Sequence, residues 1–546
     1  MAKSKKSVKS TKSAKKKIGT TTAAEEQKVT GVLRIGQAML SQDNDKYVEV
    51  VKGDERCWIS ASDAVSRDGW ITAKERLRQN NILVISEQTT RQCKSLLEDA
   101  DATGRGLVAK QPGWVDDEVY VHPDGTIQKR EDDDRIVLVD FVRQTMFDER
   151  GSVEEWKNRM APFLKADPVL SFVMAFALMG LIVPKLPNQL ENPMMELVGE
   201  RELGKTTVAV AVGSMFGGST KSGLGVIRSA NMTLNAFRQI HRQHSDSTLL
   251  LDETNVATPQ VKENLNVVFD AAAGLDKARF GDSGRKAPIR GCVLMTGNMP
   301  LEDHGRTPPD IREAARTRLI TIKMKHPLFR RLPDGFDRRE EAIGSLLTLV
   351  REQHGTISRA LIEEIIKDEQ QFLEELQRRA FKFEKRIDPL QTKVLNRVIR
   401  VFALCYATGR MAANRGILPE TNVWSRTLKA FRQYAYDLQV TRTSPSKRAL
   451  LGALKKFEPE VARIDKTKRN KKRQTAEAWM YIDTEESVLF LTSSAAKRWF
   501  GDELSKIKRE LRAEGVLQGE KGKSPKPSIK APKCVPFDGR VYRFSI

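Results

Sequence analysis

Hydrophobic and polar residues alternate with two different periods in the first part of the chain. DKYVEVV and CWISAS alternate as strands do, whereas ITAKERLRQN has the spacing of a helix. EVYVHPDGTI has the pattern of a β-hairpin that turns at Asp124-Gly125. We therefore predict an α+β accessory domain over residues 30–163.

Farther along, from Ala166 to His326, predicted strands and helices follow one another in turn. The longest apolar run, VLSFVMAFALMGLIV, spans Val169 to Val183 and is bounded by two prolines. It is shorter than the ~20 residues that a membrane-spanning helix needs, so we expect a buried helix. The pattern predicts an α/β core over residues 164–332 and no membrane segment.

The last two fifths of the chain change from helical to mixed patterning. Residues 333–440 are predicted to form a helical domain, and residues 441–473, which include DKTKRNKKRQ, a basic linker. Residues 474–546 show a strand (SVLFL), one helix (SSAAKRWFGDELSKIKRELRAEG) and a basic hairpin, which is the outline of a winged helix. The predicted DNA contacts there are Lys506, Lys508, Arg509 and Arg512, with a protein-docking wing as the alternative.

The net charge of the chain indicates what kind of partner it binds. The 546 residues carry a formal net charge of +22, and a polyanion, by default nucleic acid, is the expected partner; a generally basic surface is the alternative. Residues 1–29 are predicted to be a disordered basic arm that touches phosphates or only aids solubility, and they do not resemble a secretory signal. Five dispersed cysteines without a C-x-x-C pair exclude a standard zinc framework and indicate reduced thiols, so we expect a cytoplasmic location.

One stretch of the predicted core, MELVGERELGKTTVAVAVGSMF, has the spacing G-x-x-x-x-G-K-[ST] between an apolar strand and a helix. In this context backbone N–H groups and a helix N-terminus bind phosphate. Lys205 is expected to reach the β- and γ-phosphates of ATP and the Thr206 hydroxyl to bind Mg²⁺. The charged residues inside the loop are expected to point outward, where they could face a neighbouring subunit. The predicted nucleotide-binding residues are Gly199, Glu200, Arg201, Glu202, Leu203, Gly204, Lys205, Thr206 and Thr207.

Two more apolar strands end in polar residues. STLLLDETN delivers Asp252 as a Mg²⁺ ligand and Glu253 as the residue that polarises the attacking water. RGCVLMTGNMP ends in a polar tip that can hold this water near the γ-phosphate. We choose Asn298 for that role and keep Thr296 in reserve, and the alternative is a plain strand-to-turn sequence.

Arginines and lysines around these strands have candidate roles. An arginine from a neighbouring subunit can stabilise transition-state charge at the γ-phosphate. REAARTRLITIKM offers Arg312, Arg316 and Arg318, of which the last two are favoured jointly, and a surface salt bridge is the alternative. GLDKARFGDSGRKAPIRG is predicted to be a hairpin that grips a nucleic-acid backbone, or else an ordinary charged loop. Its cations are Lys277, Arg279, Arg285, Lys286 and Arg290.

With these residues assembled, the chain resembles the P-loop ATPases of the ring-forming AAA+ class, and its hairpin is similar to that of helicase superfamily III. More closely, it resembles a helicase-like domain family of unknown function from bacterial phage, plasmid and genomic-island replication proteins. The resemblance spans about Asp45 to His326 and rests on QPGWVDDEVYVHPDG, GERELGKTT, LLLDE, DKARF, VLMTGN and the arginine-rich strand entry.

The resemblance implies an AAA+-type ATPase core, an N-terminal accessory region and a C-terminal DNA-binding domain. It also implies ATP- and Mg²⁺-dependent unwinding or translocation of DNA by a homo-oligomer, expected to be a hexameric ring. No primase constellation of acids and cysteines is visible, so priming would need a separate protein.

Three functions are weighed on these residues. The first is a DNA-dependent ATPase motor, a helicase or translocase that replicates a phage, plasmid or other mobile element. The second keeps ATP hydrolysis without unwinding, as a switch or loader in defence, transposition or DNA packaging. The third is a DNA-binding protein with a decayed nucleotide site, against which the intact Lys205, Thr206, Asp252, Glu253 and Asn298 argue.

Overall fold

The chain forms two compact units in a computed structural model. One unit consists of Met1–Phe383 with Ala403–Trp424, and the other of Glu384–Phe402 with Ser425–Ile546. The structure describes residues 32–65, 67–186, 191–218, 226–254, 271–274, 288–301, 314–387, 396–442, 445–457, 460–464, 478–482, 487–513, 515–519, 527–533, 535 and 537–545. The predicted basic arm, residues 1–29, lies outside these ranges.

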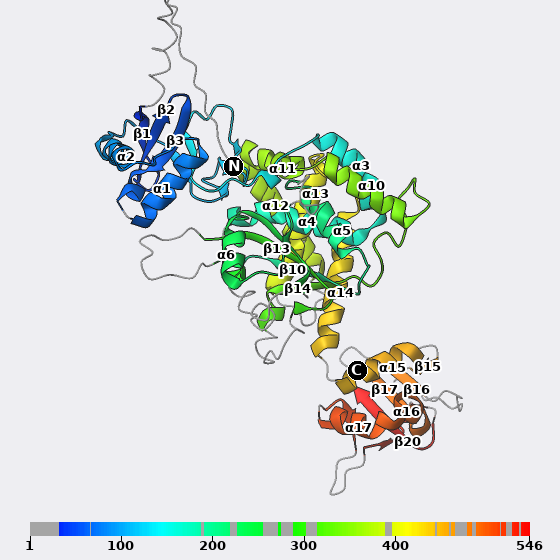
Figure 1. Cartoon of the computed structure of the whole chain (residues 1–546). Coiled ribbons are helices and arrows are strands. Elements are labelled where there is room, and N and C mark those ends of the chain that lie inside the picture. Colours follow the sequence, from blue (N-terminus) through cyan, green and yellow to red (C-terminus); the bar gives the residue numbers. More distant parts are fainter. Residues whose placement is uncertain are drawn as a thin grey trace, which may run out of the picture. The chain divides into compact units, whose positions relative to one another are not determined.

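The first unit begins with a small sheet covered by two helices (Figure 1). Its strand order is β3-β2-β1-β4, and the apolar residues of the strands and of both helices share one core. The strands and the helix expected from DKYVEVV, CWISAS and ITAKERLRQN are confirmed. The elements are β1 (Arg34–Leu40), β2 (Lys46–Lys52), β3 (Glu55–Ser60), β4 (Gly104–Arg105), α1 (Arg67–Gln79) and α2 (Glu87–Asp99).

Short strands follow, and they pack on the α/β core rather than on the small sheet alone. The expected hairpin is confirmed: β7 pairs antiparallel with β8, and Gly125 adopts a φ of 89° at the turn. The indole N–H of Trp114 donates to the carbonyl of Leu181, and the Tyr120 hydroxyl donates to that of Asp246. The strands are β5 (Leu107–Ala109), β6 (Gly113–Trp114), β7 (Tyr120–Val121), β8 (Ile127–Gln128) and β9 (Val137–Val139).

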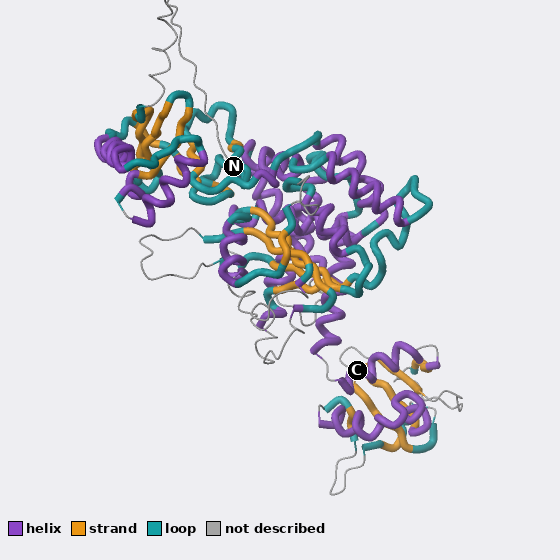
Figure 2. Tube along the Cα trace, viewed as in Figure 1, coloured by secondary structure: helices purple, strands orange, loops and turns teal. Residues whose placement is uncertain are grey.

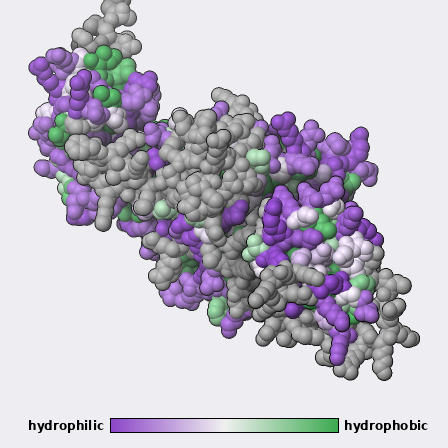
Figure 3. All heavy atoms as spheres, turned by 90° about the horizontal axis from the view of Figure 1, so that it is seen from below, coloured by the Kyte–Doolittle hydropathy of each residue, from purple (hydrophilic) through white to green (hydrophobic). Residues whose placement is uncertain are grey.

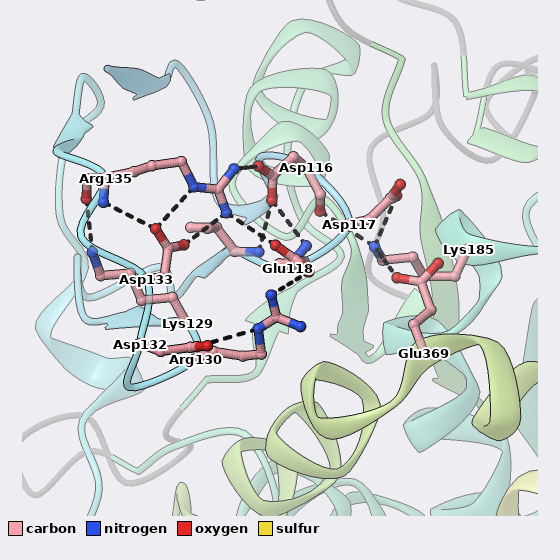
Figure 4. Close-up of polar contacts among 11 residues, drawn as sticks. Asp116, Asp117, Glu118, Lys129, Arg130, Asp132, Asp133, Arg135, Lys185 and Glu369 are labelled. Atoms are coloured by element: carbon pink, nitrogen blue, oxygen red, sulfur yellow. Dashed lines mark hydrogen bonds and ion pairs between the residues drawn. The ribbon is translucent and has the colours of Figure 1, made fainter. Parts of the chain in front are cut away.

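A buried lysine fastens this region to two other elements (Figure 4). Lys185, at the end of the 3-10 helix η5 (Val183–Lys185), lies with its ammonium 2.6 Å from Glu369 and 3.2 Å from Asp117. The same ammonium stands 4.2 Å from the ring centroid of Trp114, a cation–π contact. Arg135 ties the neighbouring loop together by binding Asp116 and Asp133. Residues 113–135 are therefore held to the core by charge as well as by packing.

The α/β core is built on a parallel sheet with the order β11-β12-β13-β10-β14. Figure 2 draws its strands in orange among the purple helices of the core. Helices α4 and α5 pack on one face of β12 and β13. The other face joins Leu249, Leu251 and Val293 to Phe237 of α6. Because the strands are covered on both sides, they read as continuous apolar runs. The strands are β10 (Met194–Val198), β11 (Arg228–Ser229), β12 (Ser247–Asp252), β13 (Gly291–Gly297) and β14 (Leu319–Lys323), and the helices are α5 (Lys205–Gly213) and α6 (Leu234–Arg242).

The apolar run predicted to be a buried helix is confirmed as one. All of α4 (Pro168–Leu178) except its first residue lies in this run, and the residues of α4 from Leu170 onward are all buried. The carboxylate of Asp167 caps its N-terminus by accepting from the backbone N–H groups of Val169 and Leu170. Within the described residues, no helix combines the length and the apolar character required to cross a bilayer.

Helices dominate the chain after the sheet, as expected for residues 333–440. Helices α12, α13 and α14 each contain residues of both units. The helices around this region are α3 (Val153–Ala166), α10 (Arg339–Glu352), α11 (Thr356–Lys367), α12 (Glu369–Ile387), α13 (Asn396–Asn414) and α14 (Val423–Arg442).

The second unit ends in a small α/β domain that corrects two expectations. The stretch predicted as a basic linker contains α15 (Pro445–Phe457), whose apolar residues join the core of this domain. The helix expected after SVLFL is two helices, α16 (Ser493–Phe500) and α17 (Leu504–Ala513), because Gly501 adopts a φ of 52° that ends the first. The strands are β15 (Val461–Arg463), β16 (Ala478–Ile482), β17 (Ser487–Thr492), β18 (Leu517–Gln518), β19 (Ile529–Lys530) and β20 (Arg540–Ser545).

Strand β20 lies between β17 and β18, with α16 and α17 between β17 and β18 in the chain. This order fits a winged helix, and that assignment stays a prediction, as do the bounds of the six predicted segments. On the face shown in Figure 3, hydrophilic side chains cover most of the described surface, and hydrophobic residues form small separate patches.

Candidate functional site

The loop between β10 and α5, residues 199–204, is the candidate phosphate-binding loop and is called the phosphate-binding loop below. Gly204 adopts a φ of 89° just before α5, where a Cβ atom would come within 2.8 Å of Leu328. The Lys205 ammonium donates to the carbonyl oxygens of Gly199 at 2.9 Å and Glu200 at 2.5 Å. Burial lowers the pKa of Lys205, and the nearby Asp252 opposes this shift.

The charged residues inside the loop are exposed. Glu200, Arg201 and Glu202 all face solvent, which confirms that their side chains point outward. Glu202 has a φ of 65°, a conformation that costs a non-glycine residue free energy and is typical of functional loops. The three charged residues are therefore compatible with a loop whose backbone N–H groups face a phosphate.

The segment after β14 supports this loop through backbone hydrogen bonds. The sequence patterns did not single this segment out. The Met324 N–H donates to the carbonyl of Val198 at 2.7 Å, and the Leu328 N–H donates to that of Leu203 at 2.8 Å. A Cβ atom on Gly199 would come within 2.7 Å of the Met324 carbonyl oxygen. No sequence motif marks MKHPLF, so only the tertiary packing identifies this support.

Three side chains meet where β12 and β13 end. The Thr206 hydroxyl of α5 lies 3.0 Å from one oxygen of Asp252 and 3.2 Å from the other. The Thr296 hydroxyl donates to the same carboxylate. The Glu253 N–H in turn lies 3.3 Å from the Thr296 oxygen. The structure thus joins the lysine loop, the acid pair and the third strand at one edge of the sheet.

The two acids differ in their surroundings. Asp252 is 5% exposed, whereas Glu253 is exposed and adopts a φ of 61°. A buried carboxylate between two hydroxyl groups suits a fixed ligand, and an exposed carboxylate beside it suits contact with water. This difference agrees with the separate roles predicted for Asp252 and Glu253, which stay predictions.

The polar tip of β13 begins beside the loop. The Gly199 N–H donates to the Gly297 carbonyl at 3.3 Å, so the half-buried Asn298 follows directly after this contact. Thr296, kept in reserve by the sequence, is the residue that contacts the acid pair.

Glu196 is a residue of this region that the sequence reasoning missed. It lies in the middle of β10 with no exposed surface. Its carboxylate accepts from the Leu301 N–H at 2.9 Å and from the Thr321 hydroxyl at 2.6 Å. The signal was a single acid inside the apolar strand MMELV, because a buried carboxylate is retained only with hydrogen-bond partners.

The candidate trans-acting arginines lie at the opposite edge of the sheet. Arg316 and Arg318 precede β14, whose first residue Leu319 is paired with Met194 at the start of β10. The Arg318 guanidinium is 3.1 Å from Glu191. Within one chain, these arginines are therefore a strand length away from Lys205. Arg312 lies outside the described residues.

Most cations of the predicted DNA-gripping hairpin, Lys277, Arg279, Arg285 and Lys286, also lie outside the described residues. Arg290 is described, and its carbonyl accepts from the Asp246 N–H at 2.6 Å just before β13. Burial lowers the pKa of Arg290, and Asp246 opposes this shift. Arg290 is thus half-buried at the amino edge of the sheet, and its DNA contact stays a prediction.

In the C-terminal domain the four predicted cations differ in exposure. Lys506 and Arg509 are exposed on α17, opposite the buried Ile507 and Leu511, and Arg512 is half-buried. Lys508 donates to the Tyr542 hydroxyl at 3.2 Å and lies over that ring. Lys506 and Arg509 are the residues best placed to meet a ligand of this helix.

The residues proposed to hold Mg²⁺ fit that ion. Mg²⁺ binds one or two carboxylates and completes its octahedron with water and substrate phosphates. The contact between the Thr206 hydroxyl and the Asp252 carboxylate brings a suitable pair of oxygen donors to the phosphate-binding loop. The part of the chain that the structure describes contains no group of three or more His, Cys, Asp or Glu arranged to hold a metal.

One solved structure described as a helicase has a fold related to that of this chain. A structure described as "SCCmec type IV Cch - active helicase" superposes with a TM-score of 0.56 at 13% sequence identity, covering 94% of this chain and 93% of that one. The NrS-1 C terminal region matches at 12% identity and TM-score 0.28, covering 62% of this chain and 78% of that one. An inhibitor-bound JCV helicase matches at 16% identity and TM-score 0.22, covering 45% and 68%.

Only the first of these superposes well enough to support the conclusion that the fold is helicase-like. Among curated proteins, none matches this chain significantly. A protein family pattern, in contrast, matches residues 1–288, which include the small N-terminal sheet, the phosphate-binding loop and the acid pair. The chain belongs to the family described as domain of unknown function DUF927.

Proposed function

We propose that this protein is an ATP-hydrolysing, nucleic-acid-dependent motor, a DNA helicase or translocase that serves the replication of a phage, plasmid or other mobile element. The observation that carries the proposal is the meeting of Thr206, Asp252 and Thr296 beside Lys205. Ligands of parallel α/β sheets bind in the crevice at the carboxyl ends of the strands, which is where these side chains lie.

Each residue has a role that follows from its chemistry and position. Backbone N–H groups of residues 199–206 bind the phosphates, and the Lys205 ammonium exchanges its loop carbonyls for β- and γ-phosphate oxygens. Thr206 and Asp252 hold Mg²⁺, which when bound neutralises charge on the phosphates. The exposed Glu253 accepts a proton from the attacking water, and Asn298 or Thr296 orients that water.

Nucleic acid and other copies of the chain complete the proposal. The net charge of +22 favours a polyanionic partner, and Lys506 and Arg509 present cations on one helix face. We propose that Arg316 or Arg318 acts in trans within a ring, expected to be hexameric, because neither lies near the Lys205 of its own chain. Glu200, Arg201 and Glu202 are exposed residues that such a subunit contact can use.

The test is ATP hydrolysis by the full chain with single-stranded DNA, forked duplex DNA or RNA as the stimulator. Lys205→Ala is expected to reduce hydrolysis to background, because it removes the cation that contacts the transferred phosphate. Lys367→Ala, which removes an exposed lysine of α11, is the control and should hydrolyse ATP like wild type. Hydrolysis by Lys205→Ala at the wild-type rate would refute the proposal.

Strand displacement from the forked duplex separates the motor from the switch or loader considered above. DNA-stimulated hydrolysis with displacement supports a helicase. Nucleotide-dependent assembly without displacement supports a loader instead. A mass measurement with and without ATP, made on the same preparation, determines the oligomeric state.

A further inference from the structure

A buried acid lies in the strand that leads to the phosphate-binding loop. Glu196 has no exposed surface and is flanked in β10 by Met195 and Leu197. Its register partners are Met295 on β13 and Thr321 on β14. A carboxylate in such surroundings is costly unless hydrogen bonds compensate for its lost hydration. The hydrogen-bond donors to its two oxygens are therefore the groups that the Glu196 carboxylate holds in place.

Each oxygen binds a different element. One accepts from the Thr321 hydroxyl at 2.6 Å, a contact between two paired strands of the sheet. The other accepts from the backbone N–H of Leu301 at 2.9 Å, beyond the end of β13. The first contact holds strands that the backbone ladder already holds. The second contact reaches the turn after β13, which lies outside the backbone hydrogen bonds of the sheet.

That turn carries Asn298. Its start is fixed by the Gly199 N–H, which donates to the Gly297 carbonyl at 3.3 Å. Its end is fixed by the carboxylate of Glu196 on Leu301. Both anchors come from β10 and the first residue of the phosphate-binding loop. The turn is thus held at its two ends by the same strand that places Lys205.

We propose that Glu196 is a positioning residue, whose carboxylate fixes the turn from Gly297 to Leu301 and so sets the place of Asn298 relative to the phosphate-binding loop. The inference rests on the proposed ATPase function and deepens it. Glu196 does not touch substrate; it acts through the backbone of the turn. Its loss therefore lowers the rate of hydrolysis while nucleotide binding persists.

Two variants of the full chain separate positioning from general stability. Glu196→Met keeps an unbranched side chain and removes both acceptors, whereas Thr321→Val removes only the contact between strands. We expect kcat for ATP hydrolysis to fall about 10- to 100-fold in Glu196→Met, because small misplacements of reacting groups cost rate of that order. The affinity for a fluorescent ATP analogue should stay within about threefold of wild type. Thr321→Val should keep the wild-type kcat.

Glu196→Gln provides the rescue. Its amide oxygen can accept from the Leu301 N–H and its NH₂ group can donate to the Thr321 oxygen, so near-wild-type kcat is expected. Glu196→Asp retains the acid and shortens its reach by one methylene, and it is expected to lower kcat as Glu196→Met does. It serves as the test where the methionine variant does not fold, as judged by thermal unfolding.

The possible outcomes are distinct. If wild type hydrolyses ATP and Lys205→Ala does not, the proposed function stands; a folded Glu196→Met or Glu196→Asp with wild-type kcat then overturns the positioning role alone. Equal loss of kcat in Glu196→Met and Thr321→Val also overturns it, since general weakening of the sheet would explain both. If wild type and Lys205→Ala are equally inactive, the proposed function fails and this inference fails with it.

Discussion

Thr296 is the residue that connects the two acids after β12. Its hydroxyl donates to Asp252, and its oxygen lies 3.3 Å from the Glu253 N–H, so one side chain orients both carboxylate-bearing residues. A hydroxyl that donates and accepts at once cannot be replaced by an apolar group without removing one hydrogen bond from each partner. Its contribution to the candidate site is therefore testable by an isosteric change.

Thr296→Val should lower kcat for ATP hydrolysis about 10- to 100-fold, because Asp252 loses a donor and Glu253 loses its backbone anchor. Nucleotide affinity should change little, since the phosphate-binding loop is untouched. Thr296→Ser should restore most of the rate. Steady-state ATPase assays and titration with a fluorescent nucleotide measure the two quantities.

Thr248→Val is the matched control for this change. Thr248 is buried in the same strand as Asp252, but its hydroxyl donates to the Ala177 carbonyl at 2.6 Å, away from the acids. It should lose stability without losing kcat. Equal rates in wild type and Thr296→Val would show that the hydroxyl does not orient the acids.

Asp246 is a buried acid at the other end of β12. Burial raises its pKa from 3.8 to about 7, against the opposing hydrogen bond from the Trp114 N–H. Because the folded-state pKa lies above the unfolded value, the protonated acid is favoured in the folded state. The protein is therefore expected to lose stability as pH rises from about 4 to 7, by roughly 4 kcal/mol from this group.

Asp246→Asn should remove this dependence. Asparagine keeps an acceptor for the Trp114 N–H and tolerates the φ of 55° at this position. The difference in Tm between variant and wild type should increase in favour of the variant between pH 5 and pH 8, as measured by thermal unfolding. A difference that is the same at both pH values would contradict a raised pKa.

At the scale of elements, α17 presents a cationic face that its own domain does not use. Ile507 and Leu511 are buried, whereas Lys506 and Arg509 are exposed on the opposite side. Lys508, also predicted from sequence to bind DNA, contacts Tyr542 of β20. The helix thus divides its basic residues between internal packing and solvent, which the periodicity alone did not resolve.

Lys506→Ala combined with Arg509→Ala should weaken DNA binding and reduce its salt dependence. Each phosphate contact contributes about 0.9 to the slope of log affinity against log salt, so the slope should decrease by about 2. Lys455→Ala with Lys456→Ala removes the same charge from α15 and is the control. Unchanged affinity and slope in the first variant would favour a protein-docking role for this domain.

At the scale of the whole molecule, the arrangement of the sheet separates the candidate arginines from the phosphate-binding loop. All the strands described in this sheet are parallel, and Arg316 and Arg318 precede β14 at the amino edge. Lys205 follows β10 at the carboxyl edge. From this position an arginine is expected to contact a γ-phosphate in another copy of the chain and not in its own.

Mixing of inactive subunits tests this arrangement. Subunits with Arg316→Ala and Arg318→Ala are expected to be inactive, as are subunits with Lys205→Ala. In a mixture, an intact loop of one subunit meets intact arginines of the other, so part of the ATPase activity should return. Activity of the mixture equal to the sum of its parts would argue against a trans-acting arginine among these two.

Local patterns determined much of this protein. The loop and its helix, the apolar strand before the acids and the buried apolar helix follow from short-range periodicity and glycine placement, and the structure confirms each of them. The break at Gly501 was missed because a glycine between two helical patterns ends a helix only when its backbone adopts a positive φ. The helix inside the predicted linker was missed because its apolar residues are few and find their partners elsewhere in the chain.

Tertiary structure alone decided which residues meet. Thr296 rather than Asn298 contacts the acids, Glu196 holds the turn after β13, and the segment from Met324 braces the loop. These contacts join residues that are between 43 positions apart, for Thr296 and Glu253, and 126 positions apart, for Met324 and Val198. Sequence periodicity reports which face of an element is buried, whereas the register between parallel strands sets which side chains become neighbours.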